Sequence, residues 1–425
     1  MWKVCYNEKK VEGGMRMFSV PYTFANEDES YITIPALKRF AREKKNEDLK
    51  TTVDRPQLLQ DIENYANQSP ENEAEVLDWL DQVLVEGIKD VQIKLIDDES
   101  FTTSFIDQDE FVEKVLEPLI VNKTNRHLNK GYTESLGVFR YEITNESVFG
   151  RRIRLYMGKL LCTFDKKHGA ATVPYPIAVD VYCDAGIIVA RAKSKSGLYK
   201  YEEDFVLEKA TPTKSEKETA AAIKWVAEKL VLNTRKSFEA ETVFKSQLYD
   251  MLEKYTKTPT EIINLMDAKK TEIDGVVETV MHQICNLRTA YREDVKSNVL
   301  NMVEKYFSIS YPNKQIFIKD REAYPLKLNA TDEEDSKVEQ TAALEEPLQS
   351  KAIFFDNKKM LQKSRACDGV TFMFARLNTM YCSRQFKVKI VVNKDYCMLK
   401  FTEYTMEEDI IHVLFSLIGT TGLAE

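Results

Sequence analysis

The sequence lacks the features that mark membrane and secreted proteins. A membrane-spanning helix needs roughly 20 apolar residues, but the longest apolar stretches, such as Ile410 to Ile418, are shorter and interrupted by polar side chains. Residues 1–10 become charged within a few positions and contain no apolar core of a secretory signal. We therefore expect a cytoplasmic protein that makes no contact with a membrane.

Paired cysteines and the common cofactor motifs are also missing. The seven cysteines form no CxxC pair, and an odd number without a regular framework predicts free thiols in a reducing compartment. The chain contains no GxGxxG, GxxxxGK[ST], GxSxG or HExxH motif. We expect neither a cofactor nor a bound metal, and the sequence leaves open whether the protein is an enzyme.

What is present is enough apolar sequence for more than one core. The chain has 425 residues, of which 43% are hydrophobic, and a single core stops growing at roughly 250 to 300 residues. Helical and alternating apolar patterns occur in separate segments, which predicts an α+β, multidomain protein. The expected parts are an N-terminal helical unit, an antiparallel β-rich middle domain, long helices and a small C-terminal α/β domain.

The first two parts are expected at residues 1–130 and 131–213. In the first part, Asp54-Arg55-Pro56 and Ser69-Pro70 are typical helix starts, and they predict a helical pair. In the second part, apolar residues recur with a period of two from 136 to 201, which predicts an antiparallel β-rich domain.

A helical region is expected at residues 214–312. Its strongest pattern is a four-three alternation of apolar residues from Ile273 to Tyr291, which continues less regularly to Tyr306. This pattern predicts one long helix over residues 272–307. An intramolecular core helix explains the pattern, and self-association or contact with a protein partner is the alternative.

The last two parts are a connector and a C-terminal domain. Residues 313–350 contain a run of acidic side chains with few large apolar residues, which predicts a connector with an acidic linker. Alternating segments and a closing apolar helix in residues 351–425 predict a small α/β domain.

The middle domain carries a local excess of positive charge. Between Arg151 and Lys200 there are ten Lys and Arg residues against three acids, although the whole chain has a net charge of -8. Arg191, Lys193 and Lys195 are spaced by two, so a strand would direct them to one face. Cations beside aromatic residues are typical of surfaces that neutralise phosphates and stack bases.

The candidate nucleic-acid-binding residues all belong to this basic segment. They are Arg151, Arg152, Arg154, Arg191, Lys193, Lys195, Tyr199, Lys200 and Tyr201. The alternative interpretation is a solvated sheet face whose lysines discourage pairing with other chains.

Three other constellations were weighed as catalytic or metal sites. Asp274, Glu278, His282 and Cys285 fall on one helical stripe, but a single straight helix cannot close a tetrahedral metal site. Cys183 with His168 has the residue types of a nucleophile and its base. Asp180, Asp184 and Lys193 have the types found in metal-dependent nucleases, although too few carboxylates accompany them.

These observations favour a nucleic-acid-binding accessory or assembly protein that uses a basic β-sheet surface and has no catalysis of its own. Its expected partners are DNA or RNA and, through residues 272–307, another protein or a second copy of the chain. One alternative is a metal-dependent nuclease or another nucleic-acid hydrolase. Another is a protein-protein scaffold with no role in nucleic-acid binding.

Overall fold

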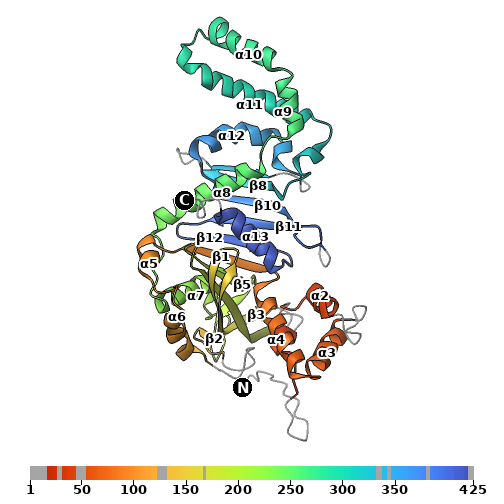
Figure 1. Cartoon of the computed structure of the whole chain (residues 1–425), viewed down its shortest axis with the longest axis vertical. Coiled ribbons are helices and arrows are strands. Elements are labelled where there is room, and N and C mark those ends of the chain that lie inside the picture. Colours follow the sequence, from red (N-terminus) through yellow and green to blue (C-terminus); the bar gives the residue numbers. More distant parts are fainter. Residues whose placement is uncertain are drawn as a thin grey trace. The chain divides into compact units, whose positions relative to one another are not determined.

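A computed structural model describes residues 17–25, 31–44, 54–121, 132–165, 169–331, 337–341, 346–379 and 383–419. These residues form helices and antiparallel strands (Figure 1), and the chain divides into two compact units. Unit 1 comprises residues 1–241, 376–384 and 393–425, and unit 2 comprises residues 242–375 and 385–392. The α+β, multidomain class is therefore confirmed.

The units are not continuous in sequence, whereas the five expected parts are. Residues after 375 contribute one strand to unit 2 and a strand and a helix to unit 1. Sequence patterns locate elements along the chain, but they do not tell which core each element joins. The five boundaries given above remain predictions.

The helical pair near the N-terminus of unit 1 begins where its capping residues predict. Asp54 caps α3 by accepting a hydrogen bond from the Gln57 N–H, and Ser69 caps α4 by accepting one from the Asn72 N–H. The helices of unit 1 are α1 (Tyr22–Ala25), α2 (Ile34–Lys44), α3 (Arg55–Ala66), α4 (Pro70–Val85), α5 (Asp98–Thr103), α6 (Asp109–Leu116), η1 (Glu117–Leu119), α7 (Ser215–Lys229) and α13 (Glu407–Ile418).

The strands of unit 1 pair antiparallel in the order β7-β6-β3-β4-β5-β1-β12, and β2 also pairs with β3. Their bounds are β1 (Lys89–Leu95), β2 (Gly137–Ser147), β3 (Gly150–Asp165), β4 (Gly169–Tyr182), β5 (Ile187–Lys193), β6 (Leu198–Lys200), β7 (Pro212–Thr213) and β12 (Cys397–Phe401). The antiparallel sheet predicted from the period of two is therefore present.

Helices cover both faces of this sheet. On one face, Leu155 and Ile188 belong to a core shared with α6 and α7. On the other, Tyr156 and Ala178 belong to a core shared with α2, α3 and α4. Alternate strand residues point to opposite faces, so the second face also receives the basic residues considered below.

Unit 2 has its own antiparallel strands in the order β11-β10-β8-β9. Its strands are β8 (Ala323–Thr331), β9 (Lys337–Thr341), β10 (Gly369–Ala375) and β11 (Gln385–Val392). Its helices are most of α8 (Ser237–Tyr255), then α9 (Thr260–Asp267), α10 (Lys270–Glu278), η2 (Thr279–Ile284), η3 (Thr289–Tyr291), α11 (Arg292–Ser310), η4 (Lys314–Phe317), η6 (Leu348–Ser350) and α12 (Ala352–Ser364). The expected acidic linker thus contains β9, and several of its acids, Asp332 to Asp335 among them, lie outside the described residues.

The prediction of one helix over residues 272–307 is wrong. The chain reverses after η2, at Asn286, whose φ of 45° is left-handed, and α10 and α11 lie side by side as a helical hairpin (Figure 1). Ile273 and Val277 pack against Val295 and Val299. The apolar pattern therefore records one small core shared by two helices, and asparagine is among the few residues that adopt the left-handed turn readily.

None of the helices within the described ranges combines the length and the apolar content that crossing a bilayer requires.

Candidate functional site

The strand pairing brings basic residues from β3 and β5, and an acidic residue from β4 between them, onto one face of the unit 1 sheet. Arg154 on β3 is opposite Asp180 on β4, and Ala178 on β4 is opposite Arg191 on β5. Lys193 follows Arg191 by two positions, so it shares that face, as the spacing predicts.

A buried ion-pair network joins these residues. Arg154 donates to both oxygens of Asp180, with Nε to Oδ1 at 2.6 Å and Nη2 to Oδ2 at 3.1 Å. Arg191 Nη2 lies 2.8 Å from Asp180 Oδ2, and the side chains of both residues are 0% exposed. Glu407, at the start of α13, pairs with Arg154 and, at 3.0 Å, with Arg191 Nη1. We call Arg154, Asp180, Arg191 and Glu407 the buried charge network.

The network holds its carboxylates ionised. Burial alone would raise the pKa of Asp180, but Arg154 and Arg191 outweigh it and lower the pKa to about 2. The pKa of Glu407 is lowered in the same way, against the effect of its burial. The network is a structural connection between β3, β4, β5 and α13, and in this arrangement Arg191 presents no surface to a phosphate.

Lys89 extends the cationic row on the neighbouring strand. The β1 and β5 registers place Lys89 opposite Lys193, and the two ammonium groups lie 5.4 Å and 4.9 Å from the centre of the Tyr31 ring. Lys89 is 3% exposed. Its burial, followed by the charges of Lys193 and Arg191, lowers its pKa to about 7.

The other predicted binding residues are closer to solvent. Lys200 is exposed, whereas Arg151, Arg152, Lys195, Tyr199 and Tyr201 are half-buried. Arg151 pairs with Asp109 at 2.5 Å, and the Tyr199 ring packs on Phe205 at a centroid distance of 5.4 Å. The structure thus separates the nine predicted residues into a buried group of Arg154, Arg191 and Lys193 and an accessible remainder.

The residues weighed for nuclease chemistry do not form a metal site. Both oxygens of Asp180 accept hydrogen bonds from Arg154, and Asp184 accepts one from the Arg151 N–H at 2.7 Å. Within the described ranges, no three His, Cys, Asp or Glu side chains are grouped closely enough to hold a metal ion. Two-metal hydrolysis therefore gains no support from Asp180, Asp184 and Lys193.

The structure does not support the other two constellations, which are the Cys183 and His168 pair and the helical stripe that includes Glu278, His282 and Cys285. Burial raises the pKa of the Cys183 thiol to about 12, which keeps it protonated and unreactive, and His168 lies outside the described residues. In the helical hairpin, Glu278 pairs with His282 at 3.3 Å and with Arg292, and Cys285 is exposed.

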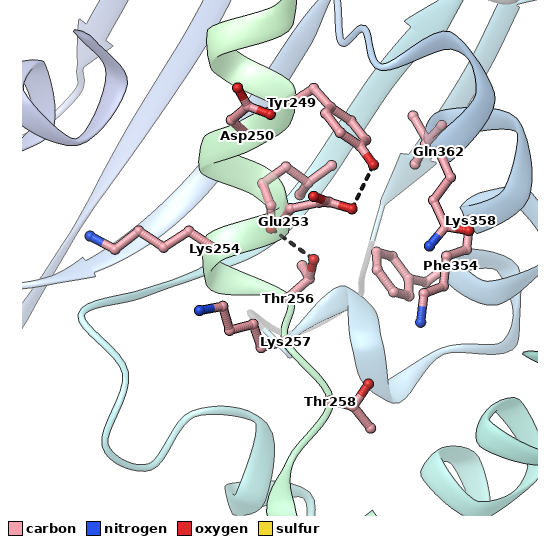
Figure 2. Close-up of a pocket in the computed structure, with 12 residues that line it drawn as sticks. Tyr249, Asp250, Glu253, Lys254, Thr256, Lys257, Thr258, Phe354, Lys358 and Gln362 are labelled. Carbon is pink, nitrogen blue, oxygen red and sulfur yellow. Dashed lines mark hydrogen bonds between the residues drawn. The ribbon is translucent and has the colours of Figure 1, made fainter. Parts of the chain in front are cut away.

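Unit 2 contains a pocket that no pattern in the sequence indicates. It has a volume of about 480 Å³ and lies between residues 249–258, from α8 onward, and α12 (Figure 2). Phe354 and Leu361 supply apolar wall, while Tyr249 donates a hydrogen bond to Glu253 at 2.6 Å. About 100 residues separate its two walls, so no local motif could reveal it. Its size is that of a small-molecule site.

Sequence reasoning also missed Lys89, Glu407 and Tyr31. Lys89 reads as an ordinary polar residue at a strand start, and Glu407 as an acidic residue in the first turn of a helix. Their importance comes from contacts with residues 104 and 216 or more positions away in the sequence. No spacing rule covers such distances.

Comparisons with known proteins give no independent indication of function. No protein-family model, curated protein or solved structure matches the chain.

Proposed function

We propose that the chain is a nucleic-acid-binding accessory or assembly protein that has no catalytic activity of its own. The observation that supports this proposal is the accessible part of the basic segment, which comprises Arg151, Arg152, Lys195, Tyr199, Lys200 and Tyr201. Arg154 and Arg191 pair with carboxylates. The accessible residues of the basic segment would therefore contact the phosphates.

Arg152 and Lys195 are the best candidates for these contacts. Arg152 Nη1 lies 3.9 Å from Glu407 Oε1, beyond hydrogen-bond length, and the Arg152 side chain is 16% exposed. Lys195 follows β5, which ends at Lys193, so the strand does not place it on the face of Arg191 as its spacing predicts; it is half-buried in the segment between β5 and β6. Tyr201 follows the end of β6 and supplies a half-buried ring for stacking, which a single strand can use without sequence preference.

The proposal predicts that Arg152→Gln with Lys195→Gln weakens binding to nucleic acid. Each lost phosphate contact removes about one unit from the slope of log affinity against log salt, so the double variant should lose about two units. Fluorescence anisotropy with a labelled oligonucleotide over a salt series measures this slope.

The matched control neutralises two lysines on the opposite face. Lys217 and Lys224 are exposed on α7, which packs against the other side of the sheet. Lys217→Gln with Lys224→Gln changes the net charge equally and should leave the slope unchanged. Equal losses in both double variants would show that binding follows net charge and not this face.

A protein-protein scaffold is the second candidate, and the helical hairpin favours it. Val276 and Ile284 on the first arm are 44% and 70% exposed, and Met302 and Tyr306 on the second arm are 47% and 58% exposed. Solvent-facing apolar side chains gathered on one element are typical of interaction surfaces.

Helix geometry places these residues on one side of the hairpin. Val276 follows the core residue Ile273 by three positions, and Met302 follows the core residue Val299 by three. Three residues rotate by about 300° around the helix axis, so each exposed residue points about 60° away from its core residue. In an antiparallel pair, equal offsets on both helices point to the same side, so one continuous apolar face results.

The scaffold candidate predicts self-association that persists in high salt. At about 1 M salt the screening length is only about 3 Å, which suppresses contacts between charges but not between apolar surfaces. Sedimentation velocity over a concentration series should show association of the native chain and its loss in Ile284→Asp with Tyr306→Asp. Val231→Asp, at a residue 73% exposed in unit 1, is the control. A monomer at every concentration contradicts self-association.

A further inference from the structure

The pocket of unit 2 has an apolar wall between two helices. Its volume of about 480 Å³ is within the range of small-molecule sites. Leu252 on α8 and Phe354 and Leu361 on α12 line it, and each of the three is at most 3% exposed. All the lining residues belong to unit 2. A small ligand with an apolar body can therefore pack here.

One carboxylate that lines the pocket has no cation beside it. The Tyr249 hydroxyl donates to Glu253 Oε1 at 2.6 Å, whereas Glu253 Oε2 has no hydrogen-bond or ion-pair partner among the described residues. Asp250, the other lining carboxylate, pairs with Arg365 at 3.2 Å. Figure 2 shows Tyr249 and Glu253 extending from α8 toward α12. The free oxygen of Glu253 is thus available to a ligand.

The Tyr249 hydroxyl keeps this carboxylate in position. Burial of Tyr249 and its hydrogen bond to Glu253 both raise the pKa of the hydroxyl, so it remains a donor at neutral pH. A charge-assisted hydrogen bond of this kind is stronger than one between neutral groups.

The lysines that line the pocket do not neutralise Glu253. Lys358 pairs with Glu304 on α11 at 2.6 Å. Lys254 and Lys257 extend away from α12 (Figure 2). An anionic ligand between α8 and α12 would therefore meet the charge of Glu253, whereas a cation would complement it.

We propose that this pocket binds a small organic cation, namely a primary amine attached to an apolar ring. The ammonium group donates to Glu253 Oε2 in a charge-assisted hydrogen bond. The side chain of Gln362, which also lines the pocket, supplies an amide oxygen as a second acceptor. The ring packs against Phe354 and Leu361, which removes apolar surface from water. The inference goes beyond the proposed function and does not depend on it, because the basic segment belongs to unit 1.

Titration of the full chain with 2-phenylethylamine, followed by ligand-detected NMR, tests the site. We expect saturable binding. Phenylpropionate carries a carboxylate in place of the ammonium group, and ethylamine lacks the ring. Each should bind about tenfold more weakly or less, because the first brings a like charge to Glu253 and the second buries little apolar surface.

Glu253→Gln tests the role of the carboxylate. The substitution removes the charge and keeps the size of an exposed side chain, so it should lower the affinity for 2-phenylethylamine about tenfold without affecting folding. Glu261→Gln is the matched control. Glu261 is an exposed residue of α9 in unit 2 that does not line the pocket, so this variant should bind the amine as the native chain does.

Three results overturn the proposal. They are the absence of saturable amine binding to the native chain, an equal affinity in the native chain and Glu253→Gln, and tighter binding of phenylpropionate than of the amine. Equal losses in Glu253→Gln and Glu261→Gln would also contradict it, because binding would then follow net charge. Oligonucleotide binding should be retained in Glu253→Gln, which separates this proposal from the proposed function.

Discussion

Replacing Asp180 by asparagine should lower the free energy of unfolding of unit 1 by about 3 to 5 kcal/mol. The substitution keeps the shape of the side chain but leaves the buried Arg154 and Arg191 with Glu407 alone of their two shared carboxylates. Breaking a buried ion pair by removing one partner has a cost of this size, because the remaining charge stays desolvated. Urea denaturation followed by tryptophan fluorescence measures the loss.

Glu228→Gln is the control for this prediction. Glu228 pairs with Lys224 on α7 at 3.7 Å, with side chains 64% and 79% exposed. An exposed pair of this type contributes at most about 0.5 kcal/mol. Similar losses in the two variants would show that the buried charge network does not stabilise unit 1 more than an exposed ion pair does.

Lys89 should make unit 1 more stable as the pH rises above neutrality. The folded-state pKa is about 7, whereas an unfolded lysine keeps its proton up to about 10.4. Between these values the unfolded state binds more protons, so the free energy of unfolding increases with pH. Lys193, Arg191, Tyr31 and Glu86 are the charged and titratable groups that face it.

The expected increase from pH 7 to pH 9 is about 2 kcal/mol. The quantity to measure is the difference in the free energy of unfolding between the native chain and Lys89→Met, in chloride buffers. The other titrating groups are present in both proteins, so their contributions cancel. Lys200→Met should follow the native curve. A Lys89→Met difference that does not change with pH would mean that Lys89 remains protonated in the folded state.

The elements that local chemistry controls could be predicted from the sequence. Asp54 and Ser69 mark helix starts because their side chains accept hydrogen bonds from N–H groups three residues on. The period of two in the middle domain predicts antiparallel strands because one face of each strand is apolar. These signals act over a few residues and need no knowledge of the rest of the fold.

The helical hairpin shows where periodicity is insufficient. Apolar spacing continues from Ile273 to Val299 with little interruption because both arms contribute to one core. The reversal depends on the left-handed conformation of Asn286. Asparagine is a modest signal compared with glycine or proline, so the pattern alone favours an uninterrupted helix.

The sequence predicts the arrangement of candidate site residues only within a single strand. The spacing of Arg191 and Lys193 establishes their common face, but burial depends on what covers that face. Here Glu407, which lies on α13 and 216 residues after Arg191 in the sequence, pairs with Arg191. Local charge density therefore located the basic segment and could not tell which cations are paired inside the protein.

The most direct test of the proposed function is the affinity of the full chain for labelled single- and double-stranded DNA and RNA over a salt series. A parallel set contains magnesium and is checked for cleavage. We predict binding that weakens steadily with salt and leaves the nucleic acid intact. Magnesium-dependent cleavage would contradict the absence of catalysis, and no binding at low salt would contradict nucleic-acid binding itself.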